Sequence, residues 1–213
     1  MSWGHDNFRQ SLCSECEMDQ PEAKPIAGTE GGSSPFLSPD DQWVGFLADR
    51  KLKKIPVEGG VATTLCNVYP LSGASWGSNS KIIFAGDLSN RYSGIGLMQV
   101  SADGGRVEIL TKPDTKNEES SHCLPFFLPG GNALLFTIMR FDVDTRPRLA
   151  LLDMDTRRYR VLFEDAADGR YLSTGHLLFM RQGTLMGARF DPDRKEAIGQ
   201  PVELVKSVIQ TLG

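Results

Sequence analysis

Histidine is the side chain that most often serves as a general acid or base at neutral pH, and this sequence contains three, His5, His122 and His176. A nucleophilic hydrolase would also need a serine or cysteine and an acid, and the Gly-x-Ser-x-Gly motif of the α/β-hydrolases is absent. His122 precedes a hydrophobic run and His176 follows a turn, so we expect both to hydrogen-bond with the backbone. The sequence therefore predicts no catalytic residues and no enzyme activity.

Metal sites are the second kind of chemistry to consider. Cys13 and Cys16 have the C-x-x-C spacing of a zinc site, but only His5 lies near them, and a structural zinc needs four ligands. Three Asp-x-Asp pairs occur, none of which continues as a calcium-binding loop, and in two of them Asp155 and Asp193 are expected to start hairpin turns. We therefore expect no metal and no cofactor.

Binding through surface loops is the remaining chemistry. The loops 85–94 and 140–147, with 112–122 beside them, combine charged and aromatic residues, a composition that suits a protein or peptide partner. The alternative is that they are solvated loops without a partner. The candidate binding residues are Arg91, Tyr92, His122, Arg140, Asp142, Asp144 and Arg146.

A repeated hairpin pattern must position these loops. Each copy has a short hydrophobic strand, a turn rich in Pro, Ser, Asp, Asn or Gly, and a second hydrophobic strand that ends on Phe. If Pro39, Ser78, Pro129 and Ser173 are equivalent, the spacings are 39, 51 and 44 residues. This is close to the roughly 40 to 50 residues of a propeller blade. The hairpins cover 36–46, 74–84, 125–136 and 170–179.

A second pair of short strands follows each hairpin, usually with a Gly or Asp turn such as Glu58-Gly59-Gly60. Four strands per unit with one hydrophobic face must stack on neighbouring units, which predicts an all-β fold, a β-propeller of about four four-stranded blades. The hairpin cores lie near 34–66, 73–111, 123–164 and 168–205. The alternative is a β-meander or a β-sandwich.

The domain organisation that we predict is an irregular segment at 1–16, propeller blades at 17–205 and a tail at 206–213. Residues 17–29 resemble the outer strand of an earlier blade. Because four blades are the lower limit for a closed ring, the chain either closes tightly, belongs to a larger propeller or is completed by a second chain. We favour a partial propeller, which could self-associate through open blade edges.

Composition limits the partners further. The 213 residues include 27 acidic and 23 basic side chains, a net charge of −4, and no basic cluster with interleaved aromatics, so we expect no nucleic acid. No run of 18 apolar residues and no signal peptide are present, and we expect no membrane insertion. Cys66 and Cys123 are expected to be small buried hydrophobic residues.

Several phrases of the sequence resemble a known family. GTEGGSSPFLSPDDQWVGF, KLKKIPVEGG, GASWGSNSKIIF, DGGRVEILT and FFLPGGNALLFT are similar to the WD-repeat-like propeller repeats of TolB-type proteins. The resemblance covers about residues 17–205. More narrowly, these phrases are similar to the propellers that lie C-terminal to the kinase domain in bacterial serine/threonine protein kinases. That resemblance implies an extracytoplasmic propeller, whereas the sequence as given carries no export signal and is compatible with the cytoplasm.

The repeats depart from the family's Ser-Pro-Asp-Gly turn at two positions that need a positive φ. Asp41 and Ser80 stand where glycine is usual, so we expect modest strain of about 1 kcal/mol at each. The motifs of a kinase domain are absent, and no kinase activity carries over. We expect a noncatalytic binding module, an accessory or sensor region of a bacterial signalling protein. The alternative is a remnant accessory domain of a kinase or a propeller-containing peptidase.

Overall fold

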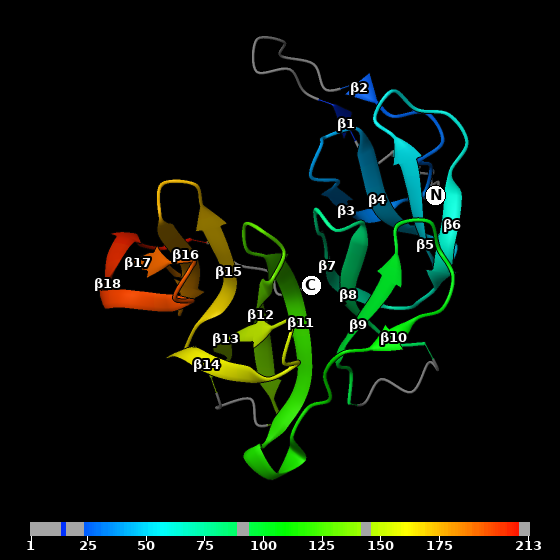
Figure 1. The fold of residues 1–213 in the computed structure, drawn as a ribbon. Helices are drawn as coiled ribbons and strands as arrows, with labels where there is room; N and C mark the ends of the chain where they lie inside the picture. The colour runs from blue at the N-terminus through cyan, green and yellow to red at the C-terminus, as the bar shows by residue number, and fades with distance from the viewer. Residues whose placement is uncertain (1–13, 16–23, 89–93, 142–145, 209–213) are drawn as a thin grey trace, which may run out of the picture.

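The computed structural model describes residues 14–15, 24–88, 94–141 and 146–208. This part of the chain contains four antiparallel sheets of four strands each and no α-helix, with one short 3₁₀ helix, η1 (Thr115–Asn117). Figure 1 shows the four sheets as separate blades, each coloured as one continuous stretch of the chain. The prediction of an all-β propeller with four four-stranded blades is therefore confirmed.

In every blade each strand pairs with the next strand along the chain, so the blades are simple antiparallel meanders. Two further short strands, β1 (Ser14–Glu15) and β2 (Lys24–Pro25), pair with each other outside the blades. The blade strands are β3 (Ser33–Leu37), β4 (Trp43–Ala48), β5 (Lys51–Pro56), β6 (Thr63–Asn67), β7 (Leu71–Trp76), β8 (Lys81–Gly86), β9 (Leu97–Ser101), β10 (Glu108–Ile109), β11 (Glu119–Phe127), β12 (Ala133–Arg140), β13 (Arg148–Asp153), β14 (Tyr159–Glu164), β15 (Ala167–Leu172), β16 (His176–Arg181), β17 (Thr184–Asp191) and β18 (Glu196–Val205).

The first strand of each blade is its inner strand. β3 packs against β7, β7 against β11, and β11 against β15. Among the described residues no comparable packing joins β15 back to β3. The four blades therefore form an open arc, with the first blade at the right of Figure 1 and the fourth at the left.

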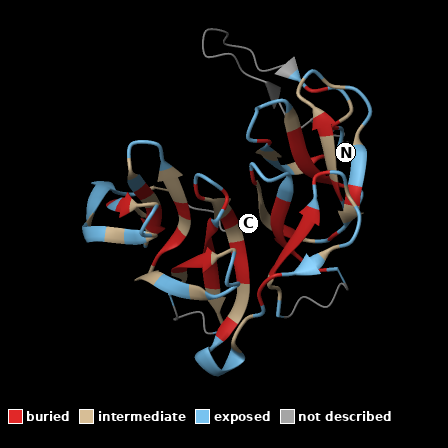
Figure 2. Ribbon diagram, viewed as in Figure 1, coloured by how far each residue is buried: buried red, intermediate tan, exposed pale blue. Residues whose placement is uncertain are grey.

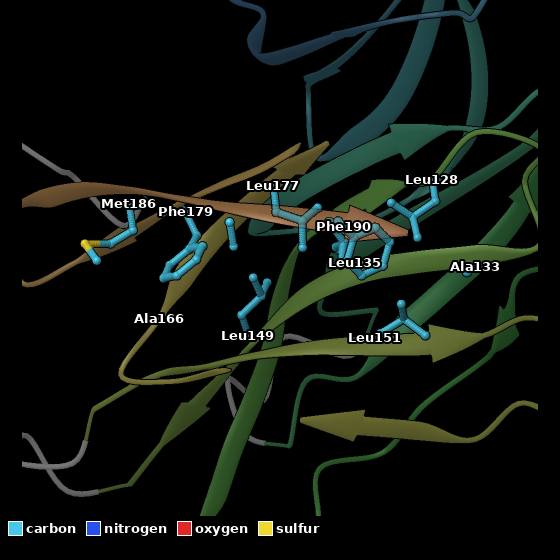
Figure 3. Packing of buried hydrophobic residues seen from close by; sticks show 11 residues of the cluster. Leu128, Ala133, Leu135, Leu149, Leu151, Ala166, Leu177, Phe179, Met186 and Phe190 are labelled. Carbon is cyan, nitrogen blue, oxygen red and sulfur yellow. The ribbon is translucent and has the colours of Figure 1, made fainter. Parts of the chain in front are cut away.

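The hydrophobic core lies between neighbouring blades, because each sheet has too little apolar surface to form a core alone. One cluster joins the first and second blades, a second joins the second and third, and a third joins the third and fourth. Figure 3 shows this third cluster, in which Leu149 of β13 faces Phe179 of β16. Phe179 also stacks on Phe163, with ring centroids 4.7 Å apart.

The two outer faces of the arc differ in how they are covered. On the first blade, Phe46 and Ile55 are buried beneath Ile26 and the turns that follow it. On the fourth blade, β18 is largely exposed, as Figure 2 shows. Val202 on that outer face is 59% exposed, whereas Leu135, on the corresponding face of the third blade, is fully buried.

The hairpin turns confirm the conformation expected from the sequence. Asp41 and Ser80 have φ values of 56° each, and Gly131 and Gly175 at the corresponding positions have 70° and 79°. Glycine populates this region at little cost, while other residues are strained in it. The first two blades therefore carry strained residues where the last two carry glycine.

Each inner strand also contains a bulge that the sequence analysis did not predict. The pairing register shifts within β3, β7, β11 and β15. The residues with positive φ inside these shifts are Ser34, Gly73, Leu124 and Asp168. The bulges bring backbones of neighbouring blades close together, since a Cβ added to Gly73 would lie 2.9 Å from the Cα of Leu124.

Candidate functional site

The loop face is the end of the blades where the second strand of each blade connects to the third and the fourth strand connects to the next blade. Its described parts are residues 49–50, 68–70, 87–88, 94–96, 110–118, 141, 146–147, 165–166 and 182–183. These connections gather along the lower side of Figure 1. The opposite end of the blades carries the tight hairpin turns and is called the turn face.

Two of the candidate binding residues lie on the loop face within ion pairs. Arg140, the last residue of β12, pairs with Glu118 of the link after η1. Arg146 donates to Asp165 Oδ2 over 2.8 Å, and its side chain is largely exposed. The same Asp165 oxygen accepts a hydrogen bond of 2.5 Å from the Gln182 amide. These pairs hold charged groups of both signs in fixed positions at this surface.

The other candidates divide into two groups. Arg91, Tyr92, Asp142 and Asp144 lie outside the described residues, so their placement stays a prediction. His122 is fully buried in β11, between the second and third blades, and does not reach the surface. The structure therefore brings Arg140 and Arg146 to the loop face and places His122 in the interior.

His122 belongs to a buried polar network. Its Nε2 lies 3.1 Å from Glu119 Oε2, and its Nδ1 lies 2.7 Å from Thr111 Oγ1. Glu119 Oε2 also accepts bonds from the backbone N–H of Asp114 at 2.7 Å and the hydroxyl of Tyr159 at 2.8 Å. The expectation of backbone bonding was wrong for the ring, which contacts side chains, although the backbone N–H of His122 does donate to Ile95 O.

The proton positions in this network follow from the acceptors. Because the Glu119 carboxylate only accepts, His122 Nε2 carries the proton and Nδ1 accepts from the Thr111 hydroxyl. Thr111 Oγ1 in turn accepts from the backbone N–H of Leu97 at 2.9 Å. Burial lowers the pKa of His122. Burial and the hydrogen bond to Glu119 raise the pKa of Tyr159. The Thr–His–Glu order resembles a catalytic triad, but a fully buried histidine cannot contact a substrate.

Sequence reasoning missed three features of the loop face. Phe141 is 64% exposed directly after Arg140. A groove of about 280 Å³ lies between the first two blades, where the Arg50 guanidinium sits 4.9 Å from the centre of the Tyr69 ring. Arg148 donates to Glu164 over 2.8 Å. The sequence signal for Phe141 is the composition of its loop, 140–147, which combines charged residues with this one aromatic residue.

The described residues contain no group of three or more His, Cys, Asp and Glu side chains able to hold a metal ion. In the two Asp-x-Asp pairs that the structure describes, the first aspartate makes the turn, not Asp155 or Asp193 as expected. Asp153 Oδ1 accepts from the backbone N–H groups of Asp155 and Thr156, and Asp191 Oδ1 accepts from those of Asp193 and Arg194. These aspartates therefore have structural roles.

Of the two free cysteines that the structure describes, Cys123 is buried and Cys66 is half-buried. Burial raises the pKa of the Cys66 thiol to about 11 and that of Cys123 to about 12, so neither is a reactive thiolate at neutral pH. Cys13 and Cys16 lie outside the described residues. Among the residues that the structure describes, no helix is long and apolar enough to span a membrane.

Comparison with solved structures identifies the fold type. A protein assigned as TolB from Agrobacterium tumefaciens aligns with a TM-score of 0.68 over 87% of this chain and 70% of its own, at 13% identity. TolB from Acinetobacter baumannii gives a TM-score of 0.61 at 12% identity, over 84% of this chain and 45% of its own. The fold is a TolB-like β-propeller. At these identities the likeness shows the fold alone.

Similar structures also occur in proteins of other kinds. A puromycin-hydrolyzing peptidase from Mycobacterium tuberculosis aligns with a TM-score of 0.62 at 15% identity, over 89% of this chain but only 31% of its own. The TolB-like propeller in this chain therefore corresponds to less than one third of that enzyme. No protein-family model matches the sequence, and no curated protein matches it either.

Proposed function

We propose that this TolB-like propeller is a noncatalytic binding module that contacts a protein or peptide partner through its loop face, as an accessory or sensor region of a bacterial signalling protein. The observation that carries the proposal is the exposed ring of Phe141 beside the ion-paired Arg140. Aromatic and arginine side chains are the residues most enriched in protein interfaces and in their energetic centres.

The geometry of the loop face supports this use. Arg146 is exposed, and its guanidinium is held by Asp165, which Gln182 holds in turn, so a partner carboxylate could bind it without ordering a free side chain. Leu88 and Tyr69 add exposed apolar surface around the groove between the first two blades. The net charge of −4 gives a nucleic-acid partner no electrostatic advantage.

A binding experiment with matched variants tests this proposal. Peptides selected from a randomised display library on the wild-type chain are titrated against Phe141→Ala and Arg146→Ala. We expect each substitution to weaken binding by more than about 1 kcal/mol, as for residues in an interface centre. Val61→Ala and Arg194→Ala remove exposed side chains from the turn face and serve as controls. Equal peptide binding by the loop-face variants and the control variants would reject the proposal that the partner binds through the loop face.

We also propose that the chain self-associates through the open end of the arc. The outer face of the fourth blade carries Ile198, Val202 and Leu204, which are exposed although the corresponding face of the third blade is a blade interface. Light scattering of the wild type should show a species heavier than the 23.4 kDa monomer. Val202→Asp should reduce the measured mass to that of the monomer. Ile109→Asp, a substitution at an exposed position of the second blade, should leave the mass of the wild type unchanged.

The second candidate function is an accessory domain of a larger enzyme, either a kinase or a peptidase. It is favoured by the match to the peptidase, of which this chain covers 31%. The neighbouring coding sequence discriminates the two proposals. A kinase or hydrolase domain in the same reading frame would support the accessory role, and its absence would support an independent binding module.

A further inference from the structure

A groove of about 510 Å³ lies between the first and second blades on the turn face, at the opposite end of these blades from the loop face. Two tryptophans, Trp43 and Trp76, line it together with Lys54, Asp40 and Asp103. Both indoles are half-buried. This groove is independent of the loop-face proposal, since it shares no residue with it.

The strand registers explain why both indoles face this groove. Trp76 pairs with Ile82, whose side chain belongs to the cluster between the first two blades, so it faces the first blade. Trp43 precedes Val44, which faces away from the second blade, so alternation directs Trp43 toward that blade. The groove between the second and third blades contains no tryptophan and is lined mainly by polar side chains and glycines.

The groove already binds a cation of its own. The Lys54 ammonium lies 4.7 Å from the centre of the Trp43 ring and 3.5 Å from Asp103 Oδ1. Only 13% of the Lys54 side chain is exposed, so this contact between a cation and an indole is built into the fold. Lys54 balances Asp103, and within the described part of the chain Asp40 forms no ion pair.

Asp40 is held in one orientation at the edge of the groove. Its Oδ1 accepts from the Ser38 hydroxyl over 2.5 Å and from the backbone N–H of Gln42 over 3.2 Å. These bonds lower the pKa of Asp40, so it stays ionised at neutral pH. Among the described residues nothing bonds to Asp40 Oδ2, which remains available as an acceptor.

We propose that this groove binds an arginine side chain presented by a peptide or protein, with the guanidinium stacked on Trp76 and hydrogen-bonded to Asp40. A guanidinium fits because it is planar, stacks on aromatic rings and donates several hydrogen bonds to a carboxylate. An ammonium is attracted to an indole face, as Lys54 is to Trp43, but it cannot stack as a planar group and donate to a carboxylate at the same time. A neutral sugar would gain nothing from the charge of Asp40.

Nuclear magnetic resonance of the two indole N–H groups tests this directly. The chain contains three tryptophans, so Trp3→Phe leaves only the signals of Trp43 and Trp76. The probe is the capped peptide acetyl-Gly-Arg-Gly-amide, compared with the same peptide carrying citrulline, which has nearly the same shape without the charge. We expect saturable shifts of both indole signals with the arginine peptide, and binding at least about tenfold weaker with citrulline, as for loss of a charged hydrogen bond.

Substitutions in the groove complete the test. Asp40→Asn should weaken arginine binding about tenfold, while Asp193→Asn, an exposed turn aspartate on the fourth blade, should leave it unchanged. The dispersion of the remaining backbone signals verifies that each variant is folded. Equal binding of the citrulline peptide, or saturation by maltotriose instead, would overturn the proposal, as would indole shifts that depend only on protein concentration. None of these outcomes bears on the loop face.

Discussion

His122 Nε2 lies 3.1 Å from Glu119 Oε2 in the interior between the second and third blades. Glu119 itself is 3% exposed, so a carboxylate is buried among three hydrogen-bond donors. A buried polar group that loses its partner costs far more than an exposed one. The network therefore joins the link after β10, the inner strand β11 and the outer strand β14 into one unit that tolerates little change.

The first prediction concerns Thr111, which connects the network to the second blade. Thr111→Val keeps the shape of the side chain but removes the acceptor of the Leu97 N–H and the donor to His122 Nδ1. We expect it to lower the free energy of unfolding by roughly 1–3 kcal/mol in urea titration. Thr64→Val, at an exposed position of β6, should change it by less than about 0.5 kcal/mol. Similar losses in both variants would contradict a special role for Thr111.

The second prediction is a pH dependence of stability. Burial lowers the pKa of His122 in the folded chain, while in the unfolded chain it stays near 6.5. Between the two pKa values the unfolded chain binds a proton that the folded chain does not, so stability decreases as pH falls below about 6.5. The free energy of unfolding should therefore be lower at pH 5.5 than at pH 7.5. His122→Gln should remove this component and His176→Gln should retain it; identical pH profiles for all three proteins would refute it.

The repeat could be predicted from the sequence because turns and hydrophobic runs are local properties. The positive φ of Asp41 and Ser80 could be predicted because both residues stand where the family's Ser-Pro-Asp-Gly turn has glycine. The bulges of the inner strands could not be predicted in this way. Ser34, Leu124 and Asp168 all adopt positive φ, but these three residue types share no property that would mark the position in the sequence. The conformation is imposed by packing between blades.

The candidate site was predictable only in part, for a similar reason. Which residues lie on the loop face follows from strand order, and Arg140 and Arg146 do lie there. The buried network of His122 includes Glu119 and Tyr159, and these two residues are 40 positions apart in the sequence. No local sequence pattern therefore reveals that His122 is buried. The facing tryptophans of the turn face likewise come from two different blades.

The third prediction uses the strained hairpin turns. Asp41→Gly and Ser80→Gly should each raise the free energy of unfolding by up to about 1 kcal/mol, because glycine adopts a φ of 56° without the steric cost. Thermal and urea unfolding provide the measurement. Gly131→Ala, at the corresponding turn of the third blade, should have the opposite sign; a destabilised Asp41→Gly would show that the aspartate is not strained.

The fourth prediction concerns the close approach of two inner strands. Gly73→Ala would place a Cβ 2.9 Å from Leu124 Cα of the next blade, at a φ of 101°. Gly31→Ala has a φ of 70° and open space, so it reports the backbone cost alone, about 1 kcal/mol. We expect Gly73→Ala to lose a further 1–3 kcal/mol, roughly, from overpacking. Equal losses in the two variants would mean that the blades separate easily at this point.

The central claim, a partner bound through the loop face, is tested most directly by hydrogen–deuterium exchange of the chain with and without a selected peptide. We predict slowed exchange in 110–118 and in 146–148, which carry the partners and neighbours of Arg140 and Arg146, and unchanged exchange in the turn-face hairpins. Protection confined to the hairpin turns, or to the exposed β18 of the fourth blade, would contradict the account.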